Sequence, residues 1–490
     1  MKRHYALFFR IGCIAVVVLT LALRLYKINA PIADWHSFRQ VDTASVAKIF
    51  LARGIDLLHP RYHDLSNIQS GKDNPQGWRM VELPLYQAAS VLMVKAFPSI
   101  SLEVALRLVS ILAAAGTALL LMLLMRELTS PGTAIIAGLV YAVMPYSIFY
   151  GRAVLPETFA VFWAMLSVYL TFRVSAKQSV MWGTLLLAAV SAGVSVLVKP
   201  TAGFLLLPVP YLLLKRRILG LSTLVSLVIF GVISLVPLLW WRNWITRYPE
   251  GIPVFDWLLN KGEIRFKGAW FQWLFAERIA KLMFGFWGIV PLALGFIVPR
   301  QKKEGWTLPL LAVGGLSYLS IFAAGNVQHD YYQIILIPIL CLFAAKGYTL
   351  LVSGTAFSRT AGVALAAVST LFFVAFSWYT IRTYYWINRP EIITAGTDAD
   401  RLLPKDAKVI APYNGDTTFL YQTGRSGWPL GFDIDEKIAM GATHYVTVSP
   451  TDSDWETKTL AETYTVLVRN DRYAIIDLTK PKMPKKVTNE

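Results

Sequence analysis

The sequence is poor in cysteine and in charged residues. Only 2 of its 490 residues are cysteine and 16% are charged, whereas a soluble globular protein carries about 25% charged residues. Cys13 and Cys341 both fall inside apolar segments, which excludes a disulfide framework and a cysteine-based metal site. Hydrophobic residues make up 55% of the chain, and the mean hydropathy is +0.50. These proportions predict a polytopic membrane protein.

Acidic residues are scarcer than basic ones, with 30 Asp and Glu against 47 Lys and Arg, so the formal net charge is +17. The basic residues gather in short runs between apolar segments, for example at Arg126 and at Lys302-Lys303. This spacing follows the positive-inside rule and differs from the basic stripe of a nucleic-acid-binding face. We therefore expect membrane lipid, and no nucleic acid, among the partners of the protein.

Long apolar runs recur along the chain. Segments that are long enough to cross a bilayer lie near residues 7–25, 102–125, 132–150, 155–172, 180–198, 201–214, 218–240, 281–299, 306–324, 331–350 and 361–380. They predict an α-helical polytopic membrane protein with about eleven transmembrane helices. No small-residue cleavage site follows the first run, so we expect an uncleaved first helix. Arg24 lies at the end of that helix, where its side chain is expected to reach the interface.

The charge pattern also predicts an orientation. With the N-terminus in the cytoplasm, the short cytoplasmic turns are all basic, as the positive-inside rule requires. This arrangement places residues 26–101, the aromatic-rich loop 242–280 and everything after about residue 384 outside the cytoplasm. We expect residues 1–390 to form the membrane domain, with amphipathic helices in the first outer loop, residues 26–101.

The chain changes character after about residue 390. Strand-like runs at 408–411, 443–449, 464–469 and 472–478 alternate with helix-like runs at 416–422 and 433–440. They predict a small extracytoplasmic α/β domain at residues 391–480. The last residues, 481–490, are basic and contain proline, and we expect them to be disordered.

The stretch that most strongly suggests chemistry is residues 35–50, directly after the first apolar run. It places His36, Arg39 and Asp42 within a few positions of one another. From Val41 onward apolar residues repeat at helical spacing, which predicts a short amphipathic helix with Asp42 at its head. We expect Asp42 to be the centre of an active site. The alternative is that Asp42 is a plain helix cap or first-turn acid, which would need no chemistry.

Further polar residues gather at the expected outer ends of the transmembrane helices. They are Arg152, Glu157, Lys199, His329, Tyr331 and Tyr332. Each type also has a purely structural explanation, because an acid after proline starts a helix, a lysine suits a helix C-terminus and tyrosines suit the interface. If the helices bundle, however, carboxylates and cations converge on one side of the membrane. A lipid-linked sugar phosphate suits such a set, since cations bind the phosphate and a carboxylate activates an incoming hydroxyl.

Four short motifs carry a resemblance to a known family. They are the run from His36 through Arg39-Gln40 to Asp42-Thr43, the run Gly151–Glu157, the turn Leu197-Val198-Lys199-Pro200, and the run Gln328–Gln333 with Pro338 after it. Together with the layout of residues 1–390, they resemble the C-type (GT-C) multi-spanning glycosyltransferases, above all family 39. That family includes protein O-mannosyltransferases and the related lipid A aminoarabinose transferases. The sequence departs from the family at Thr43, where a second acid is usual, and at Glu82-Leu83-Pro84, where the family has Lys-Pro-Pro.

The resemblance implies an inverting glycosyltransferase that takes its sugar from a polyprenyl-phosphate donor. It makes Asp42 the candidate base, with Glu157 positioning the acceptor or Asp42 itself. The residues that it implies for the donor phosphate are Arg152, Lys199 and His329, and those for the substrate groove are His36, Arg39, Tyr331 and Tyr332. The expected location is the inner (plasma) membrane, with the C-terminal domain in the periplasm. The acceptor stays open among lipid, glycan and protein.

Two further alternatives remain at this point. No cofactor is certain: separate carboxylates leave a divalent cation open, but no adjacent acidic pair supports a metal site. The second alternative is a lipid or solute transporter or flippase. Such proteins place charged sites near the bilayer midplane and often show inverted repeats, and the sequence shows neither.

Overall fold

The chain folds into two compact units. The computed structural model describes residues 2–176, 181–215, 220–355 and 358–482. The first, here named the helical unit, comprises Met1–Asn29, Glu82–Trp244 and Phe255–Tyr385. The second, named the sheet unit, comprises Ala30–Val81, Ile245–Val254 and Trp386–Glu490. The domain limits expected from the sequence, at residues 390 and 480, stay predictions.

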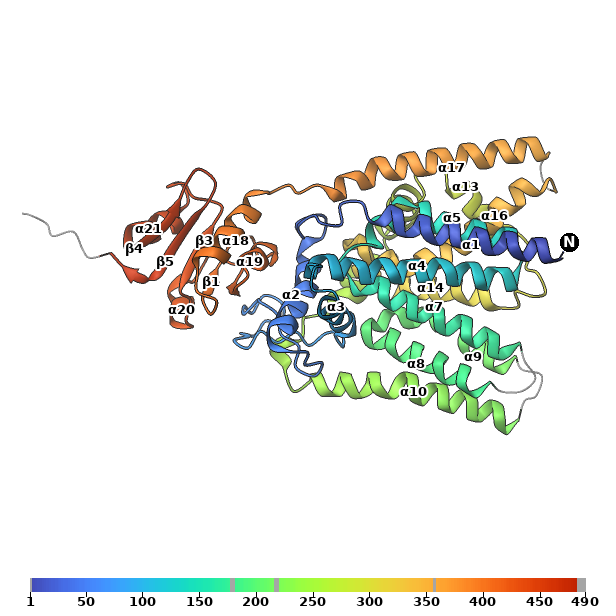
Figure 1. Cartoon of the computed structure of the whole chain (residues 1–490), viewed down its shortest axis with the longest axis horizontal. Helices are drawn as coiled ribbons and strands as arrows, with labels where there is room; N and C mark the ends of the chain where they lie inside the picture. The colour runs from blue at the N-terminus through green and yellow to red at the C-terminus, as the bar shows by residue number, and fades with distance from the viewer. Residues whose placement is uncertain (1, 177–180, 216–219, 356–357, 483–490) are drawn as a thin grey trace, which may run out of the picture. The chain divides into compact units, whose positions relative to one another are not determined.

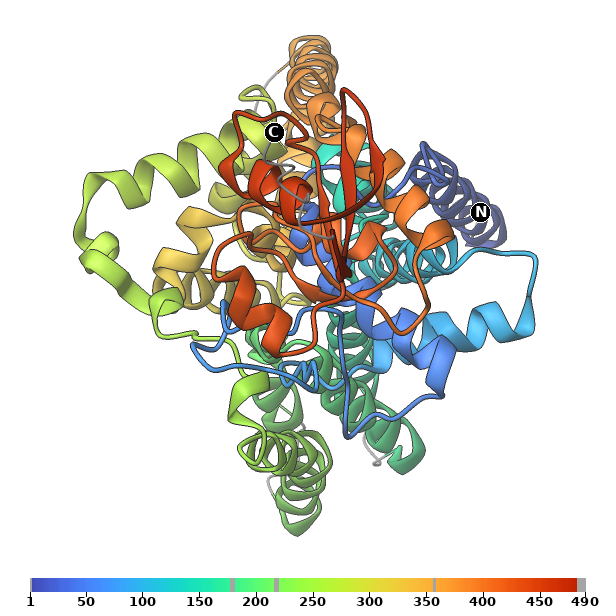
Figure 2. The same cartoon turned by 90° about the vertical axis from the view of Figure 1, so that its left-hand side faces the viewer.

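The helical unit consists of helices and short helical turns that run side by side (Figures 1 and 2). Its main helices are α1 (Lys2–Arg24), α3 (Leu85–Ala96), α4 (Leu102–Leu128), α5 (Pro131–Val143), α6 (Pro145–Tyr150), α7 (Pro156–Ser175), α8 (Trp182–Val198), α9 (Pro208–Leu214), α10 (Leu221–Ile245), α13 (Ile289–Ile297), α14 (Thr307–Ile321), α15 (Ala323–Gln328), α16 (Ile337–Ser353) and α17 (Arg359–Ile381). Shorter pieces are η1 (Pro200–Leu206), α11 (Trp257–Asn260), η3 (Lys261–Phe266), α12 (Gly268–Phe271), η4 (Gln272–Met283), η5 (Asp330–Leu336) and η6 (Arg382–Tyr385).

Six helical segments of the described chain are long and apolar enough to cross a membrane. They are Ala6–Arg24, Leu102–Leu128, Pro156–Ser175, Leu221–Ile245, Asp330–Ser353 and Arg359–Tyr385. Shorter apolar helices occupy four more of the expected spans, at Pro131–Val143, Trp182–Val198, Pro200–Leu214 and Thr307–Ile321. The expected fold class, a polytopic α-helical membrane protein with a small C-terminal sheet domain, is confirmed. The count of eleven spans stays a prediction.

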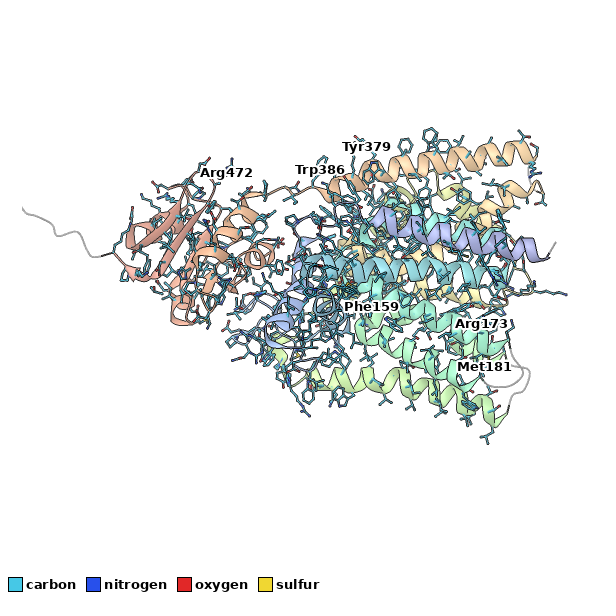
Figure 3. All side chains as sticks on the ribbon, in the orientation of Figure 1. Phe159, Arg173, Met181, Tyr379, Trp386 and Arg472 are labelled. Atoms are coloured by element: carbon cyan, nitrogen blue, oxygen red, sulfur yellow. The ribbon has the colours of Figure 1, made fainter. Side chains whose placement is uncertain are left out.

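Burial separates central from peripheral helices. In their apolar stretches α4 and α16 are 72% and 89% buried, whereas α1, α10 and α17 are 17–28% buried. Exposed apolar and aromatic side chains such as Tyr379 line the outer face of α17 (Figure 3). Small residues allow the closest approach, because a Cβ on Gly347 would lie 1.7 Å from the carbonyl oxygen of Pro291. Such small-residue contacts are the usual way for helices to pack where lipid surrounds them.

Arg24 corrects one expectation from the sequence. Its side chain is fully buried and does not reach the interface. The guanidinium donates to the carbonyl oxygens of Thr20 and Tyr141 and to the hydroxyl of Ser147, at 2.7–3.3 Å. These acceptors lie within the helical unit and satisfy a charge that would otherwise be costly to bury.

The sheet unit is built on a five-stranded mixed sheet of order β2-β1-β3-β5-β4. Its strands are β1 (Lys408–Ile410), β2 (Ser426–Trp428), β3 (His444–Thr447), β4 (Tyr464–Arg469) and β5 (Ala474–Pro481). Strands β2, β1 and β3 are parallel, and β5 runs antiparallel to both β3 and β4. Its helices are α2 (Ser37–Arg53), α18 (Glu391–Leu402), α19 (Thr418–Gln422), α20 (Ile434–Ala439) and α21 (Trp455–Thr463), and η2 (Pro249–Gly251) is a single turn.

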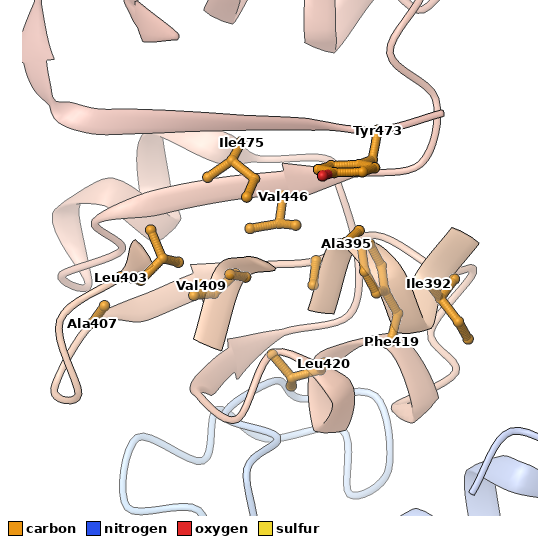
Figure 4. Packing of buried hydrophobic residues seen from close by; sticks show 12 residues of the cluster. Ile392, Ala395, Leu403, Ala407, Val409, Phe419, Leu420, Val446, Tyr473 and Ile475 are labelled. Atoms are coloured by element: carbon orange, nitrogen blue, oxygen red, sulfur yellow. The ribbon is translucent and has the colours of Figure 1, made fainter. Parts of the chain in front are cut away.

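The core of this unit packs strand residues against helices. Val409, Val446 and Ile475 come from three neighbouring strands, and Phe419 and Ile392 cover them from α19 and α18 (Figure 4). The expected strands and helices of this region are all present, with ends shifted by up to three residues. The sequence missed β2, α18 and α21. Of the expected disordered tail, residues 483–490 lie outside the described residues.

Residues of the first loop continue the sheet beyond β2. The N–H of Leu65 donates to the carbonyl oxygen of Gly427, and the N–H of Gly427 donates to that of His63, at 2.8 and 2.9 Å. The loop is thereby fixed to the same sheet that carries α19. This pairing positions the loop residues that surround Asp42.

Candidate active site

Asp42 lies inside helix α2 and not at its head. The helix begins at Ser37, after His36 in the left-handed conformation (φ 53°), and its first turn contains no acid. Residues 39–47 are all buried, so the expected amphipathic pattern is wrong. The reason is that α2 packs against α19 of the sheet unit, and its polar side chains find partners there instead of water. The helix-cap explanation for Asp42 therefore does not apply.

Three side chains hold the Asp42 carboxylate. Oδ2 accepts a hydrogen bond from Gln69 Nε2 at 3.0 Å and forms an ion pair with Arg79 Nη2 at 3.0 Å, and Oδ1 accepts a hydrogen bond from Thr417 Oγ1 at 2.8 Å. Asp42 is only 3% exposed. The Arg79 guanidinium also donates to Gln69 Oε1 and lies over the ring of Tyr62. The carboxylate is thus oriented and paired, as a buried charged group must be to be stable.

Two more acids belong to the surroundings of Asp42. Burial raises the pKa of Asp64 to about 7; hydrogen bonds from Ser66 oppose this rise, and the negative charge of Asp42 adds to it. Burial also raises the pKa of Asp416, with Asp42 again adding to the effect and Thr418 opposing it. Asp64 therefore changes its charge near neutral pH.

A second group of charges lies in the helical unit around Lys199. Lys199 Nζ is 2.6 Å from Glu157 Oε1 and 3.3 Å from Glu82 Oε1. Glu157 stands in the first turn of α7, after Pro156, and Lys199 follows the last residue of α8. Because α7 and α8 pack along each other, two of the expected site residues meet. The third member, Glu82, is the residue at which the sequence departs from the family motif.

The Lys199 group is held differently from Asp42. Glu157 is fully buried, and the geometry of its contact with Lys199 is that of an ion pair without a hydrogen bond. Among the described residues, neither oxygen of Glu157 accepts a hydrogen bond. With one ammonium against two carboxylates, the group carries a net negative charge when all three are ionised. A buried acceptor without a donor is rare in native proteins and calls for a bound water or ligand.

The expected aromatic residues join this group. The Tyr332 ring lies 5.7 Å from Lys199 Nζ and 4.6 Å from the ring of Tyr331. His329 stacks on Tyr331 at 5.4 Å and meets Trp257 edge-on at 5.8 Å. His329 precedes η5, and Tyr331 and Tyr332 lie within it. The structure thus brings together Glu157, Lys199 and the aromatic segment at 329–332.

The described contacts of Arg152 involve a different set of residues. Arg152 is 1% exposed, its guanidinium lies 4.6 Å from the ring of Tyr385, and it donates to the carbonyl oxygen of Lys27 at 3.4 Å. The buried Asp330, the first residue of η5, accepts hydrogen bonds from Tyr150 of α6, at 2.6 Å, and from Tyr384 of η6.

His36 and Arg39 lie at the start of α2. The His36 ring contacts those of Trp35 and Phe38 at 5.0 and 5.7 Å. Arg39 is 8% exposed, and its carbonyl oxygen accepts a hydrogen bond from Thr43. Neither role in a substrate groove is tested by these contacts, and both stay predictions.

Sequence reasoning missed several partners of the two carboxylates. The sequence motifs assign no role to Arg79, Gln69, Glu82 or Thr417. Arg79 lies in the same loop as Asp42 and could have been suspected from that alone. Thr417 is 375 residues away in sequence and gives no local signal. Within the described residues no group of three or more His, Cys, Asp or Glu is placed to hold a metal ion.

Comparisons with known proteins agree with this architecture. The model of a family described as dolichyl-phosphate-mannose-protein mannosyltransferase matches residues 85–241, which lie in the helical unit. A search of curated proteins gives no match.

Solved structures match over nearly the whole chain. ArnT from Cupriavidus metallidurans bound to undecaprenyl phosphate has 14% sequence identity and a TM-score of 0.62, covering 97% of this chain and 98% of its own. The oligosaccharyltransferase of Archaeoglobus fulgidus has 10% identity and a TM-score of 0.57, covering 89% and 67%. The mycobacterial arabinofuranosyltransferase AftD has 15% identity and a TM-score of 0.61, covering 96% and 40%.

At these identities the likeness is one of fold. The chain has the fold of the GT-C membrane glycosyltransferases, and the resemblance predicted from its motifs is confirmed.

Proposed function

We propose that the protein is a membrane glycosyltransferase that moves a sugar from a polyprenyl-phosphate donor to an acceptor outside the cytoplasm. The observation that carries this proposal is the buried Asp42 carboxylate, held by Gln69, Arg79 and Thr417 in a chain with the GT-C fold. The solved ArnT structure, which carries undecaprenyl phosphate, supports a lipid-linked donor. The sugar itself and the acceptor are left open.

Asp42 acts as the base. Its oxygen takes the proton of the acceptor hydroxyl, whose oxygen attacks the anomeric carbon as the bond to the donor phosphate breaks. The polyprenyl phosphate leaves as a phosphomonoester anion and needs no general acid. A single displacement of this kind inverts the anomeric carbon, and a positioned base contributes about 10²–10⁴ in rate. If the acceptor group is a phosphate, Asp42 orients it instead.

The Lys199 group and its neighbours bind the donor. Lys199 exchanges a carboxylate partner for the donor phosphate, and Glu157 offers an oxygen to a sugar hydroxyl or to the acceptor. Arg152 and His329 supply further positive charge, and Tyr331 and Tyr332 give flat apolar surfaces that suit a sugar or an isoprenoid chain. His36 and Arg39 line the substrate groove.

The charge pattern of the short turns supports a location in the inner (plasma) membrane, with a cytoplasmic N-terminus and the α/β domain outside. A transporter or flippase is the second candidate that the sequence left open. No observation on the described residues favours it over the enzyme, and the same assay separates the two.

The test uses purified full-length protein and a panel of radiolabelled polyprenyl-phosphate sugars. We expect the wild type to transfer or hydrolyse one of them and Asp42→Asn to lose a factor of about 10²–10⁴. Asp477→Asn is the matched control, since Asp477 is an equally buried acid of the sheet unit. Equal activity of Asp42→Asn and wild type would remove Asp42 as base. Donor moved across a vesicle membrane but never consumed would favour the transporter.

A further inference from the structure

The sheet unit contains a cavity that the proposed chemistry does not use. It has a volume of about 550 Å³, which is the size of a small-molecule site. It lies between the end of α2, the loop that follows and the segment 245–254. Its lining includes Phe50, Arg53, Asp56, His59, Arg61, Trp78 and Tyr248. All of them belong to the same compact unit.

One wall of the cavity is aromatic. The rings of Trp78 and Tyr248 lie 5.1 Å apart, and the ring of His59 lies 5.9 Å from Trp78 and 5.7 Å from Tyr248. All three side chains are partly exposed, so their faces line the cavity and are not hidden in the core. Flat aromatic surfaces of this kind bind the C–H face of a sugar ring.

The aromatic wall is built to keep its shape. The N–H and carbonyl oxygen of Trp78 are both bonded to the side chain of Asn74, at 2.8 and 2.9 Å. Gly251, three residues after Tyr248, approaches so closely that a Cβ there would lie 2.7 Å from Trp78 Cβ. A preformed wall lowers the cost of ordering side chains on binding.

The remaining charge of the cavity is positive. The Arg61 guanidinium lies 4.2 Å from the Trp78 ring, and Arg53 stands exposed at the last position of α2. Asp56 is the one acid among the lining residues, and its oxygens are taken up locally. Oδ1 accepts from the N–H groups of Leu58 and His59, and Oδ2 lies 3.0 Å from His59 Nδ1. Two guanidinium groups are therefore left to attract an anion.

We propose that this cavity binds an acidic saccharide, a sugar ring that carries a phosphate or a carboxylate. The aromatic wall takes the ring, and Arg61 and Arg53 pair with the anion, as guanidinium groups do with both kinds of oxyanion. That this saccharide is part of the acceptor rests on the proposed function, whereas the binding itself does not. A surface of solvated arginines is the competing explanation, and it predicts neither the aromatic wall nor a preference for a sugar.

Isothermal titration calorimetry on the full-length protein in a neutral detergent tests the proposal. The probes are glucose 1-phosphate, glucuronate, methyl glucoside and inorganic phosphate. We expect the two acidic sugars to bind at least about tenfold more tightly than the neutral sugar, since a charged hydrogen bond contributes about that much. We expect a similar preference over inorganic phosphate, because the free anion lacks the ring that the aromatic wall takes. Failure of both acidic sugars to bind would overturn the proposal. Equal binding of inorganic phosphate would reduce the cavity to a general anion site and overturn its sugar half.

Variants locate the binding. Arg61→Gln and Trp78→Leu should each weaken it about tenfold or more, while Trp78→Phe should keep most of it. Arg472→Gln removes the same charge from an exposed position of the sheet unit (Figure 3) and should change nothing. If Arg472→Gln weakens binding as much as Arg61→Gln does, the effect is one of net charge and the site assignment fails.

Asp42→Asn separates this proposal from the proposed function. This variant should bind the acidic sugars as the wild type does, because Asp42 does not line the cavity. Binding by the wild type without any sugar transfer by the wild type would leave the cavity standing and remove the enzyme. Sugar transfer without binding of the probes would support the enzyme and remove the proposed cavity site.

Discussion

The two carboxylates expected to carry chemistry, Asp42 and Glu157, are both buried but are held in opposite ways. Asp42 accepts hydrogen bonds from two neutral side chains and pairs with an arginine, all within the sheet unit. Glu157 pairs with the ammonium of Lys199, which also pairs with Glu82. The first carboxylate is fixed in direction by several donors, as a base must be. The second is paired with a cation, and both of its oxygens lack a hydrogen-bond donor among the described residues.

The largest expected effect comes from breaking the Lys199 group. Lys199→Gln leaves two buried carboxylates without their cation, which should lower the free energy of unfolding by about 3–5 kcal/mol. Thermal unfolding in detergent measures it. Adding Glu157→Gln and Glu82→Gln should recover most of the loss, because no uncompensated charge then remains. The control Lys281→Gln, which breaks the partly exposed pair with Glu277, should cost no more than about 1 kcal/mol. A similar loss of stability for both lysine variants would mean that the Lys199 group contributes no more to folding than a partly exposed ion pair does.

The acids around Asp42 give the stability of the sheet unit a dependence on pH. The pKa of Asp64 is about 7 in the folded protein, against about 3.9 when unfolded. The folded state therefore binds more protons between these values, and the free energy of unfolding should fall by about 4 kcal/mol as the pH rises from 4 to 7.

Asp64→Asn tests this pH dependence. It should flatten the fall in the unfolding midpoint between pH 4.5 and pH 7.5, while the exposed Asp471→Asn should not. An unchanged slope in Asp64→Asn would show that Asp64 stays ionised beside Asp42, Arg79 and Tyr62.

Arg79 should matter for turnover more than for folding. Arg79→Gln removes the cation that pairs with Asp42, and a loss of about 1.5–3 kcal/mol in the stabilisation of the base would lower the rate of sugar transfer about 10- to 100-fold. Arg79→Lys should restore part of the rate, because it keeps the charge but loses the planar fork. Steady-state kinetics on both variants, with the donor in excess, measure this. Activity within twofold of the wild type in Arg79→Gln would separate Arg79 from catalysis.

The comparison also explains what sequence could and could not predict. Apolar runs and strand-like alternation are local signals, so the helices, the C-terminal sheet and the motif residues Asp42, Glu157 and Lys199 were predictable. The meeting of Glu157 with Lys199 follows from the packing of consecutive helices. The donors to Asp42 are different, because Gln69 and Arg79 depend on how a loop joins a sheet edge. Thr417 comes from the far end of the chain, and Glu82 replaces the lysine that the family pattern led one to expect.

Thr417 offers the smallest and sharpest test of how Asp42 is held. Thr417→Val keeps the shape of the side chain but removes the Oγ1–H group that donates to Asp42 Oδ1. A neutral hydrogen bond contributes about 1 kcal/mol, so the rate of transfer should fall about fivefold, and Thr417→Ser should recover it. A loss as large as that of Asp42→Asn would mean that Thr417 touches the substrate itself. If the valine variant instead kept the full rate, Gln69 and Arg79 would suffice to orient the base, and the link between the C-terminal domain and Asp42 would be structural only.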